Sequence, residues 1–253
     1  GLHGMLVLVW ISGLMFILRM FAGPFVEKLN PTGMLLGGSF LTCGGLLMFS
    51  YVETNILPLM IAGALFACGI TFFVPNMIGL MSERFPKAGS LGIVLLIGMG
   101  FVGGGASNAI MGEIADSYLP EALNEQETVR ILETVEDRFP AYLKKAQKAK
   151  GDAEAIAELG YRAADIRNVL EQTREALSYY RENGALQGAA TGNALRALAD
   201  SGVPQENELT QQASEILRPA DNYGGRMAFR WVAPIAVGSG IVFLIWFVRD
   251  RRR

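Results

Sequence analysis

The charged residues of this chain are spread so unevenly that different parts of it must fold in different solvents. Of the 46 charged side chains, 30 lie in residues 121–225, whereas residues 1–120 carry only nine. Residues 121–225 hold 12 Lys and Arg against 18 Asp and Glu, and residues 226–253 return to an apolar run with a basic end. Such a chain is not one soluble domain. Its net charge of −2, without a basic groove, argues against a nucleic-acid partner.

Five apolar stretches are long enough to cross a bilayer, which takes about 20 helical residues. They are residues 4–26, 29–52, 54–82, 88–112 and 231–248. Lipid offers no partner for backbone N–H and C=O groups, so each stretch is predicted to be a helix. We expect an all-α membrane protein in three parts. Residues 1–120 hold four membrane helices, residues 121–225 a soluble insert, and residues 226–253 the last membrane helix with a basic tail.

Basic residues in the short connections predict the orientation. The connections that contain Lys28 and Arg84 are basic, the connection at residues 51–55 is not, and the C-terminal tail holds four arginines. By the positive-inside rule the two basic connections and the C-terminus are cytoplasmic, and the insert is extracytoplasmic. Arg226 and Arg230 favour the opposite orientation but are outnumbered by the tail. We therefore expect a multi-pass protein of the cytoplasmic (inner) membrane.

Glycine and proline mark places where the helices can bend or pack closely. Pro75 lies inside the third stretch, removes one backbone hydrogen bond and should kink the helix. The fourth stretch holds the triplet Gly103, Gly104 and Gly105. Tight helix packing is one interpretation of the triplet, and a hinge or unwound segment lining a cavity is the other. Several bendable helices in one bundle indicate a protein that moves.

Four polar side chains within the third and fourth stretches are candidates for a substrate cavity: Thr71, Asn76, Ser107 and Asn108. A Thr or Ser hydroxyl can form a hydrogen bond to the backbone of its own helix, so Thr71 and Ser107 say less about a cavity. An amide needs a neighbouring helix or a wet cavity, and for Asn76 and Asn108 both alternatives stay open. No Asp or Glu lies at mid-membrane depth, so a proton-coupling residue would have to lie outside this chain.

Metal and nucleophile chemistry find no support in the sequence. Cys43 and Cys68 lie in apolar runs and are interpreted as small packing residues, and His3 is the only histidine. We predict neither a metal, nor a cofactor, nor an enzyme. The chain begins with glycine directly before an apolar stretch and lacks the pattern of a signal peptide, so we expect a piece of a longer protein.

Several motifs resemble those of the major facilitator superfamily. The first basic connection, from Arg19 to Gly33, is similar to the Gly-x-x-x-Asp/Glu-Arg/Lys-x-Gly motif of that family. The connection at residues 82–89 resembles its inner loop after helix ten, and residues 69–77 resemble helix ten of sugar- and nucleoside-type members. On this resemblance the five spans are helices eight to twelve of a major-facilitator-type bundle, with the insert between the last two.

The same connections supply candidates for an inner gate: Arg19, Gly23, Glu27, Lys28, Glu83 and Arg84. Gly23 and Glu27 are four residues apart and share a helix face, so another helix end can approach the carboxylate. Glu27 would then bind that helix end or Arg19. The alternative is a solvated helix end.

The sequence pattern of the insert predicts a soluble helical hairpin. Asn124 and Glu127 have the spacing of a capping pair, and residues 150–152 have the pattern of a helix stop followed by a new start. Apolar residues from Leu159 to Tyr180 follow a heptad seam, and residues 129–143 offer a partner stripe. We predict an antiparallel hairpin joined at Gly151, then looser helices near residues 185–200 and 205–217. Helical structure is predicted to be interrupted at both ends of the insert, because Pro120 should end one helix and Gly224-Gly225 should form a flexible joint.

The resemblance implies a secondary active transporter, namely a symporter, that moves a small polar solute such as a sugar or nucleoside by alternating access. Its expected partners are the solute, the lipid bilayer and the N-terminal half of the same transporter. An extracytoplasmic protein is a further candidate partner for the insert. The alternative hypothesis is a membrane-anchored extracytoplasmic interaction module, in which the insert is the working part.

Overall fold

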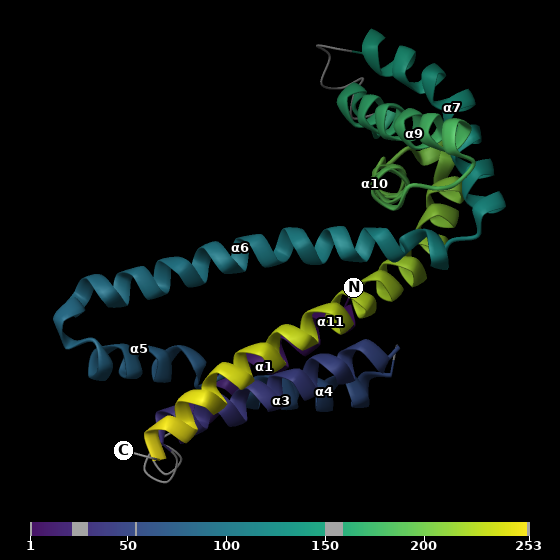
Figure 1. The fold of residues 1–253 in the computed structure, drawn as a ribbon. Helices are drawn as coiled ribbons and strands as arrows, with labels where there is room; N and C mark the ends of the chain where they lie inside the picture. Colours follow the sequence, from purple (N-terminus) through teal and green to yellow (C-terminus); the bar gives the residue numbers. More distant parts are fainter. Residues whose placement is uncertain (1, 22–29, 54, 150–158, 252–253) are drawn as a thin grey trace. The chain divides into compact units, whose positions relative to one another are not determined.

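The computed structural model describes residues 2–21, 30–53, 55–149 and 159–251, and within them every regular element is a helix (Figure 1). The all-α prediction is confirmed for this part of the chain. The helices form two compact units. We call residues 1–111 with 226–253 the membrane unit and residues 112–225 the insert unit.

The membrane unit is built from six helices or parts of helices that the structure describes. They are α1 (Leu2–Met20), α3 (Pro31–Tyr51), α4 (Ile56–Ile70), α5 (Phe73–Arg84), the first part of α6 (Gly89–Ala122) and the last part of α11 (Asn207–Arg251). A short 3-10 turn, Pro86–Ala88, joins α5 to α6.

Four helical segments are long and apolar enough to cross a membrane: Pro31–Tyr51, Ile56–Arg84, Pro86–Ala122 and Pro204–Arg249. Among the described residues the fifth predicted span is a shorter apolar helix, Gly4–Met20. Four of the five predicted spans thus have the required length and composition, which is consistent with a membrane protein.

Glycines bring α3 and α4 into backbone contact. A Cβ atom added to Gly45 would lie 2.7 Å from the Phe66 nitrogen, and one added to Gly38 would lie 2.6 Å from the Gly69 carbonyl oxygen. Residue numbers rise along α3 as they fall along α4, so the two helices are antiparallel. Close approach through small residues is the usual way in which membrane helices associate. The glycines of the second predicted span therefore serve packing.

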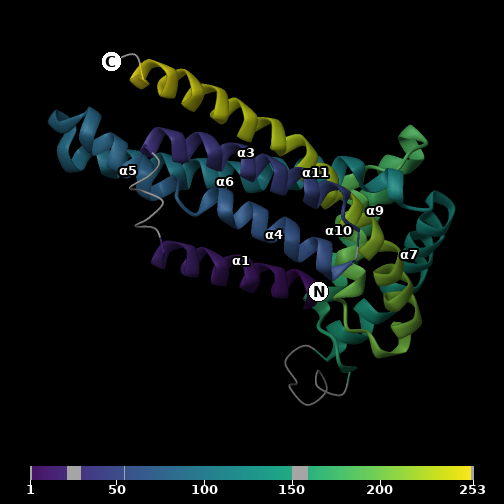
Figure 2. The ribbon, with the colours of Figure 1, turned by 90° about the horizontal axis from the view of Figure 1, so that it is seen from below.

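On its other side α3 packs against α11, also antiparallel. Phe49 stacks on Phe229 with ring centroids 5.4 Å apart, and Phe247 lies against Gly33. Figure 2 shows the resulting order α1, α4, α3, α11 across the membrane unit. Helix α3 therefore runs opposite to both α4 and α11, as alternation of consecutive spans requires for the second, third and fifth of them.

Arg226 and Arg230, which oppose the predicted orientation, both have partners in the membrane unit. Arg226 forms an ion pair with Glu53 at 3.1 Å, and the guanidinium of Arg230 lies 5.9 Å from the ring centroid of Tyr51. Tyr51 ends α3 and Glu53 follows in the connection to α4, a region where the sequence holds no basic residue. These arginines therefore serve contacts at that end of the unit.

Two antiparallel helices form the centre of the insert unit. They are α7 (Glu125–Lys148) and α9 (Ala163–Asn183), and Asn124 caps α7 by accepting a hydrogen bond from the Glu127 N–H at 3.3 Å. The two helices bury a common core in which Phe139 and Ile166 are fully enclosed. Helix α10 (Gly188–Ala199), a 3-10 turn (Pro204–Glu206), the end of α6 and the start of α11 complete the unit.

The predicted seam is interrupted. Gly160 adopts a positive φ of 76° after Leu159, and α9 starts only at Ala163, so Leu159 does not share a helix with the rest of the seam. The left-handed conformation is open to glycine at little cost and stops a helix there. The predicted hairpin joint at Gly151 lies outside the described residues.

The predicted breaks at the ends of the insert are wrong. Helix α6 continues through Pro120, and α11 is helical through Gly224 and Gly225. A Cβ at Gly224 would collide with the Ala115 carbonyl, so this glycine allows α11 to touch α6 inside the insert unit. Gly188 of α10 likewise lies against the Asp116 carbonyl, which is the one that Pro120 leaves without a helical partner. Packing, not chain reversal, explains these residues.

Candidate functional site in the membrane unit

The third predicted span is broken at its middle. Helix α4 ends at Ile70, α5 begins at Phe73, and Thr71 and Phe72 lie in the turn between them. Pro75 has no N–H, so the carbonyl of Thr71, four residues earlier, receives no helical hydrogen bond from it. The predicted irregularity at Pro75 is therefore present, and it leaves the Thr71 carbonyl oxygen free to accept a hydrogen bond from another donor.

Arg19 supplies such a donor. Its Nε donates to the Thr71 carbonyl oxygen at 3.4 Å, from the last turn of α1. Nearer the N-terminal ends of both helices, Nε1 of Trp10 donates to the Met60 carbonyl at 3.0 Å, so α1 and α4 run parallel. The contact places a guanidinium beside the break in an apolar helix, where an uncompensated cation is costly. Among the described residues Arg19 forms no ion pair.

Asn76 lies one turn beyond the break and is buried, with 8% of its surface exposed. Its backbone N–H donates to the Phe72 carbonyl at 3.1 Å, which restarts the helical pattern after Pro75. Its side-chain Nδ2 finds no hydrogen-bond partner in the part of the chain that the structure describes. A buried amide that lacks a partner costs free energy, so such a group calls for a specific explanation.

Thr71 and Ser107 satisfy themselves locally, as expected for hydroxyl side chains in membrane helices. The Thr71 hydroxyl donates to the Ala67 carbonyl, and that of Ser107 donates to the Gly104 carbonyl at 3.0 Å. Ser107 and Asn108 are exposed on α6, whereas Thr71 is fully buried. The structure thus groups Thr71 with Asn76 at the break and leaves Ser107 and Asn108 apart from them.

The glycine triplet has no close neighbour among the described residues, so both of its interpretations stay predictions. Helix α6 is continuous through Gly103, Gly104 and Gly105. No described atom lies within 4 Å of a Cβ built at any of the three. The neighbouring Phe101 and Val102 are among the most exposed apolar residues, at 78% and 75%. This face of α6 therefore suits lipid or a further protein segment.

The gate candidates are only partly described. Gly23, Glu27 and Lys28 lie outside the described residues. Glu83 is exposed at the end of α5, and the guanidinium of Arg84 lies 5.1 Å from the ring centroid of Trp246 on α11. This cation–π contact joins the C-terminal parts of α5 and α11. The sequence does not predict it, because Trp246 there indicates only a residue at the membrane–water interface.

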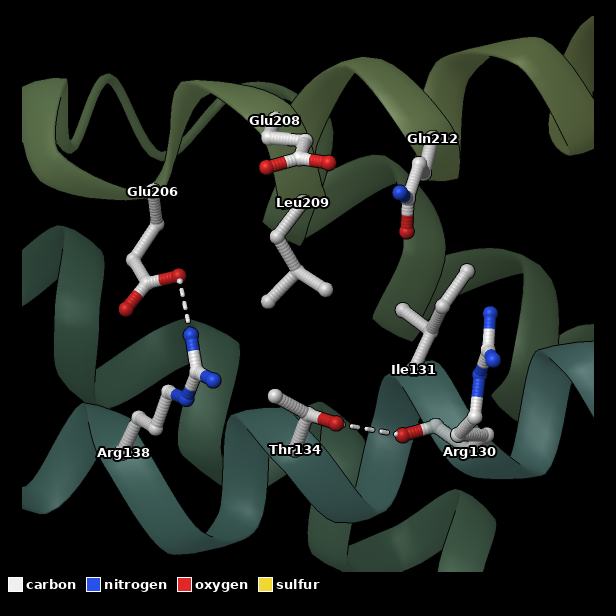
Figure 3. Close-up of a pocket in the computed structure, with 8 residues that line it drawn as sticks. All are labelled: Arg130, Ile131, Thr134, Arg138, Glu206, Glu208, Leu209 and Gln212. Atoms are coloured by element: carbon white, nitrogen blue, oxygen red, sulfur yellow. Dashed lines mark hydrogen bonds and ion pairs between the residues drawn. The ribbon is translucent and has the colours of Figure 1, made fainter.

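A second polar region lies in the insert unit, in a pocket of about 230 Å³ between α7 and the start of α11 (Figure 3). The nearly buried Glu206 accepts hydrogen bonds from Arg138 at 3.2 Å and from the hydroxyl of Tyr142 at 3.0 Å. Burial, followed by the hydrogen bond to Glu206, raises the pKa of Tyr142. These groups satisfy one another, so we interpret the cluster as a clamp that holds the 3-10 turn on α7.

Comparison of the chain with models of protein families, with characterised proteins and with solved structures gave no match.

Proposed function

We propose that this chain is the C-terminal part of a major-facilitator-type secondary active transporter, which moves a small polar solute, sugar- or nucleoside-like, across the cytoplasmic membrane. The remaining half of the bundle would come from a preceding segment of the same protein. The insert unit would face outward, and the C-terminus inward. No residue is assigned a catalytic role.

One observation carries the proposal: an apolar segment long enough to span a membrane has an irregular turn near its middle, and buried polar groups gather at that turn. The break combines the Thr71 carbonyl, the guanidinium of Arg19 and the unpartnered amide of Asn76. Discontinuous membrane helices typically form the substrate site of secondary transporters near the bilayer midplane. A helix that served only as an anchor would gain nothing from a break, a buried amide and a cation.

The competing hypothesis, a membrane-anchored interaction module, draws on the separate core of the insert unit. That core includes Phe139, Ile166 and Leu195, all fully buried, and does not need the membrane unit to close it. The two hypotheses differ in what they expect of the break. An anchor tolerates any apolar replacement at Asn76, whereas a transporter does not.

Asn76→Leu is therefore expected to slow solute exchange by at least tenfold in the full-length protein, because the amide that contacts the solute is lost. Exchange of radiolabelled monosaccharides and nucleosides would be measured in proteoliposomes and normalised to inserted protein. Ser82→Ala on the same helix is the matched control, since the Ser82 hydroxyl only bonds to the Ile78 carbonyl of its own helix. Equal exchange by Asn76→Leu and wild type, or no exchange of any solute by wild type, would refute the proposal.

A further inference from the structure

Basic side chains gather at one end of the membrane unit, where α5 and α11 end and α6 begins. Residues 83–89 and 246–253 hold six Lys and Arg against two Asp and Glu, which gives these segments a net charge of +4. Among the described side chains of these segments, Arg84, Lys87 and Arg249 are the cations, and all three are exposed. We refer to these three residues as the basic rim.

The contact between Arg84 and Trp246 holds one cation of the rim against the end of a second helix. The guanidinium lies 5.1 Å from the centroid of the indole ring. Behind this contact, Phe73 of α5 packs edge-on against Phe243 of α11, with ring centroids 6.0 Å apart. Tryptophan near the end of a membrane helix typically lies at headgroup depth. The guanidinium on its ring therefore presents a planar set of donors at that depth, which suits a phosphate group.

Lys87 and the start of α6 add positive potential to the rim. Lys87 lies in the 3-10 turn that joins α5 to α6, three residues after Arg84. The first turn of α6 is fixed against α5, since a Cβ at Gly92 would lie 2.7 Å from the terminal carbon of Met81. The first turn of a helix carries N–H groups that have no helical partner, and with them a partial positive charge. Both contributions favour an anion at this end of the unit.

Arg249 completes the rim from α11, and exposed apolar side chains lie beside it in the sequence. Arg249 follows Trp246 by three residues, a spacing that places the two side chains on one face of the helix. Phe85, next to Arg84, is 53% exposed, and Leu91 in the first turn of α6 is 67% exposed. Exposed cations next to exposed apolar residues are typical of a surface that meets lipid headgroups and acyl chains together.

The position of the rim favours a lipid over a soluble anion. Within the described ranges Lys87 and Arg249 form no ion pair, so their charge is available to an external anion. A soluble anion would use only the charge of the rim. An anionic lipid would place its phosphate beside Trp246 and its acyl chains along Phe85 and Leu91, and so would use both kinds of side chain. Basic clusters directly beside a membrane helix typically bind such lipids.

We propose that the basic rim binds the phosphate headgroup of an anionic phospholipid such as phosphatidylglycerol. The guanidinium of Arg84 donates to the phosphate oxygens, and Lys87 and Arg249 supply further positive charge around them. The ligand is a component of the bilayer and not a transported solute. The inference therefore goes beyond the proposed function and does not depend on it.

The test uses Trp246 as the reporter of bound lipid. In the full chain, with Trp10 and Trp231 replaced by phenylalanine, Trp246 is the only tryptophan. Brominated phospholipids quench tryptophan fluorescence on contact, so vesicles with brominated phosphatidylglycerol or brominated phosphatidylcholine give the ratio of the two affinities at this site. We expect a preference for phosphatidylglycerol of about fivefold or more, the effect of one Lys or Arg near an anionic membrane surface.

Neutralising the rim should bring this preference close to one. The rim variant carries three changes: Arg84→Gln, Lys87→Gln and Arg249→Gln. A control with the same change in net charge neutralises three exposed cations of the insert unit and should keep the preference: Lys144→Gln, Lys148→Gln and Arg167→Gln. All six side chains are exposed, and thermal unfolding would verify that both variants are folded.

A chain that keeps only Trp10 separates a local site from general attraction of anionic lipid to the protein. Residues 4–18 of α1 carry no charge, so the two brominated lipids should quench Trp10 equally. A preference at Trp246 that only the rim variant loses supports the proposal. No preference at Trp246, a preference that the rim variant keeps or the control variant also loses, or an equal preference at Trp10 overturns it. Displacement of the lipid by inorganic phosphate at constant ionic strength also overturns it, because the ligand would then be a soluble anion.

Discussion

Pro75→Ala is expected to stabilise the membrane unit while slowing solute exchange by at least tenfold. An alanine at this position supplies the N–H that the Thr71 carbonyl lacks, so the helix can close across the turn at Thr71 and Phe72. Proline in a helix interior is about 3 kcal/mol less favourable than alanine. The restored hydrogen bond competes with Arg19 for the Thr71 carbonyl. Stability and activity should therefore change in opposite directions.

The measurements are thermal unfolding in detergent and exchange in proteoliposomes on the same preparations. Pro58→Ala is the matched control, because Pro58 lies in the first turn of α4, where the missing N–H has no helical partner in any case. It should change neither quantity appreciably. Wild-type exchange by Pro75→Ala would show that the break has no part in transport.

Gly69→Ala is expected to destabilise the membrane unit by about 1 to 3 kcal/mol, the usual cost of overpacking a tight core. The new Cβ would lie 2.5 Å from the Thr42 nitrogen and 2.8 Å from the Gly38 carbonyl oxygen, and these backbone atoms cannot yield without separating α3 from α4. The gain of up to about 1 kcal/mol that alanine brings to a helix does not offset this clash.

Gly79→Ala provides the control on the same predicted span. Nothing lies within 4 Å of a Cβ at Gly79, so this variant should be as stable as wild type or slightly more so. Thermal unfolding of both variants in the same detergent gives the comparison. If Gly69→Ala were as stable as Gly79→Ala, the contact between α3 and α4 would not be as close as described.

Features that depend on composition and local pattern could be predicted from the sequence. The apolar stretches predicted the long helices, since burial in lipid requires length and the absence of charge. The Asn124 cap and the packing stripe of α7 followed from spacing alone. Pro75 predicted an irregular helix, and Thr71, four residues earlier, could have been identified as the freed carbonyl by the same rule.

Features that depend on contacts distant in sequence could not. Glycine and proline commonly end helices, yet Gly224 and Pro120 are both helical because α6, α10 and α11 pack closely around them. The donor to the Thr71 carbonyl cannot be predicted either, because Arg19 is 52 residues away and its spacing from Glu27 suggests a place in the inner gate. The heptad spacing predicts a continuous seam across Gly160, because such spacing does not reveal a single residue with left-handed backbone conformation.

The most direct test of the account is whether the position of Asn76 becomes accessible from both sides of the membrane. Asn76→Cys would be introduced into the full-length protein with Cys43 and Cys68 replaced by alanine, and labelled with an impermeant thiol reagent in right-side-out and inside-out vesicles. Alternating access predicts that the introduced thiol reacts from both sides, and that a transported solute lowers both rates. Labelling from one side alone, or rates that no solute alters, would contradict the account.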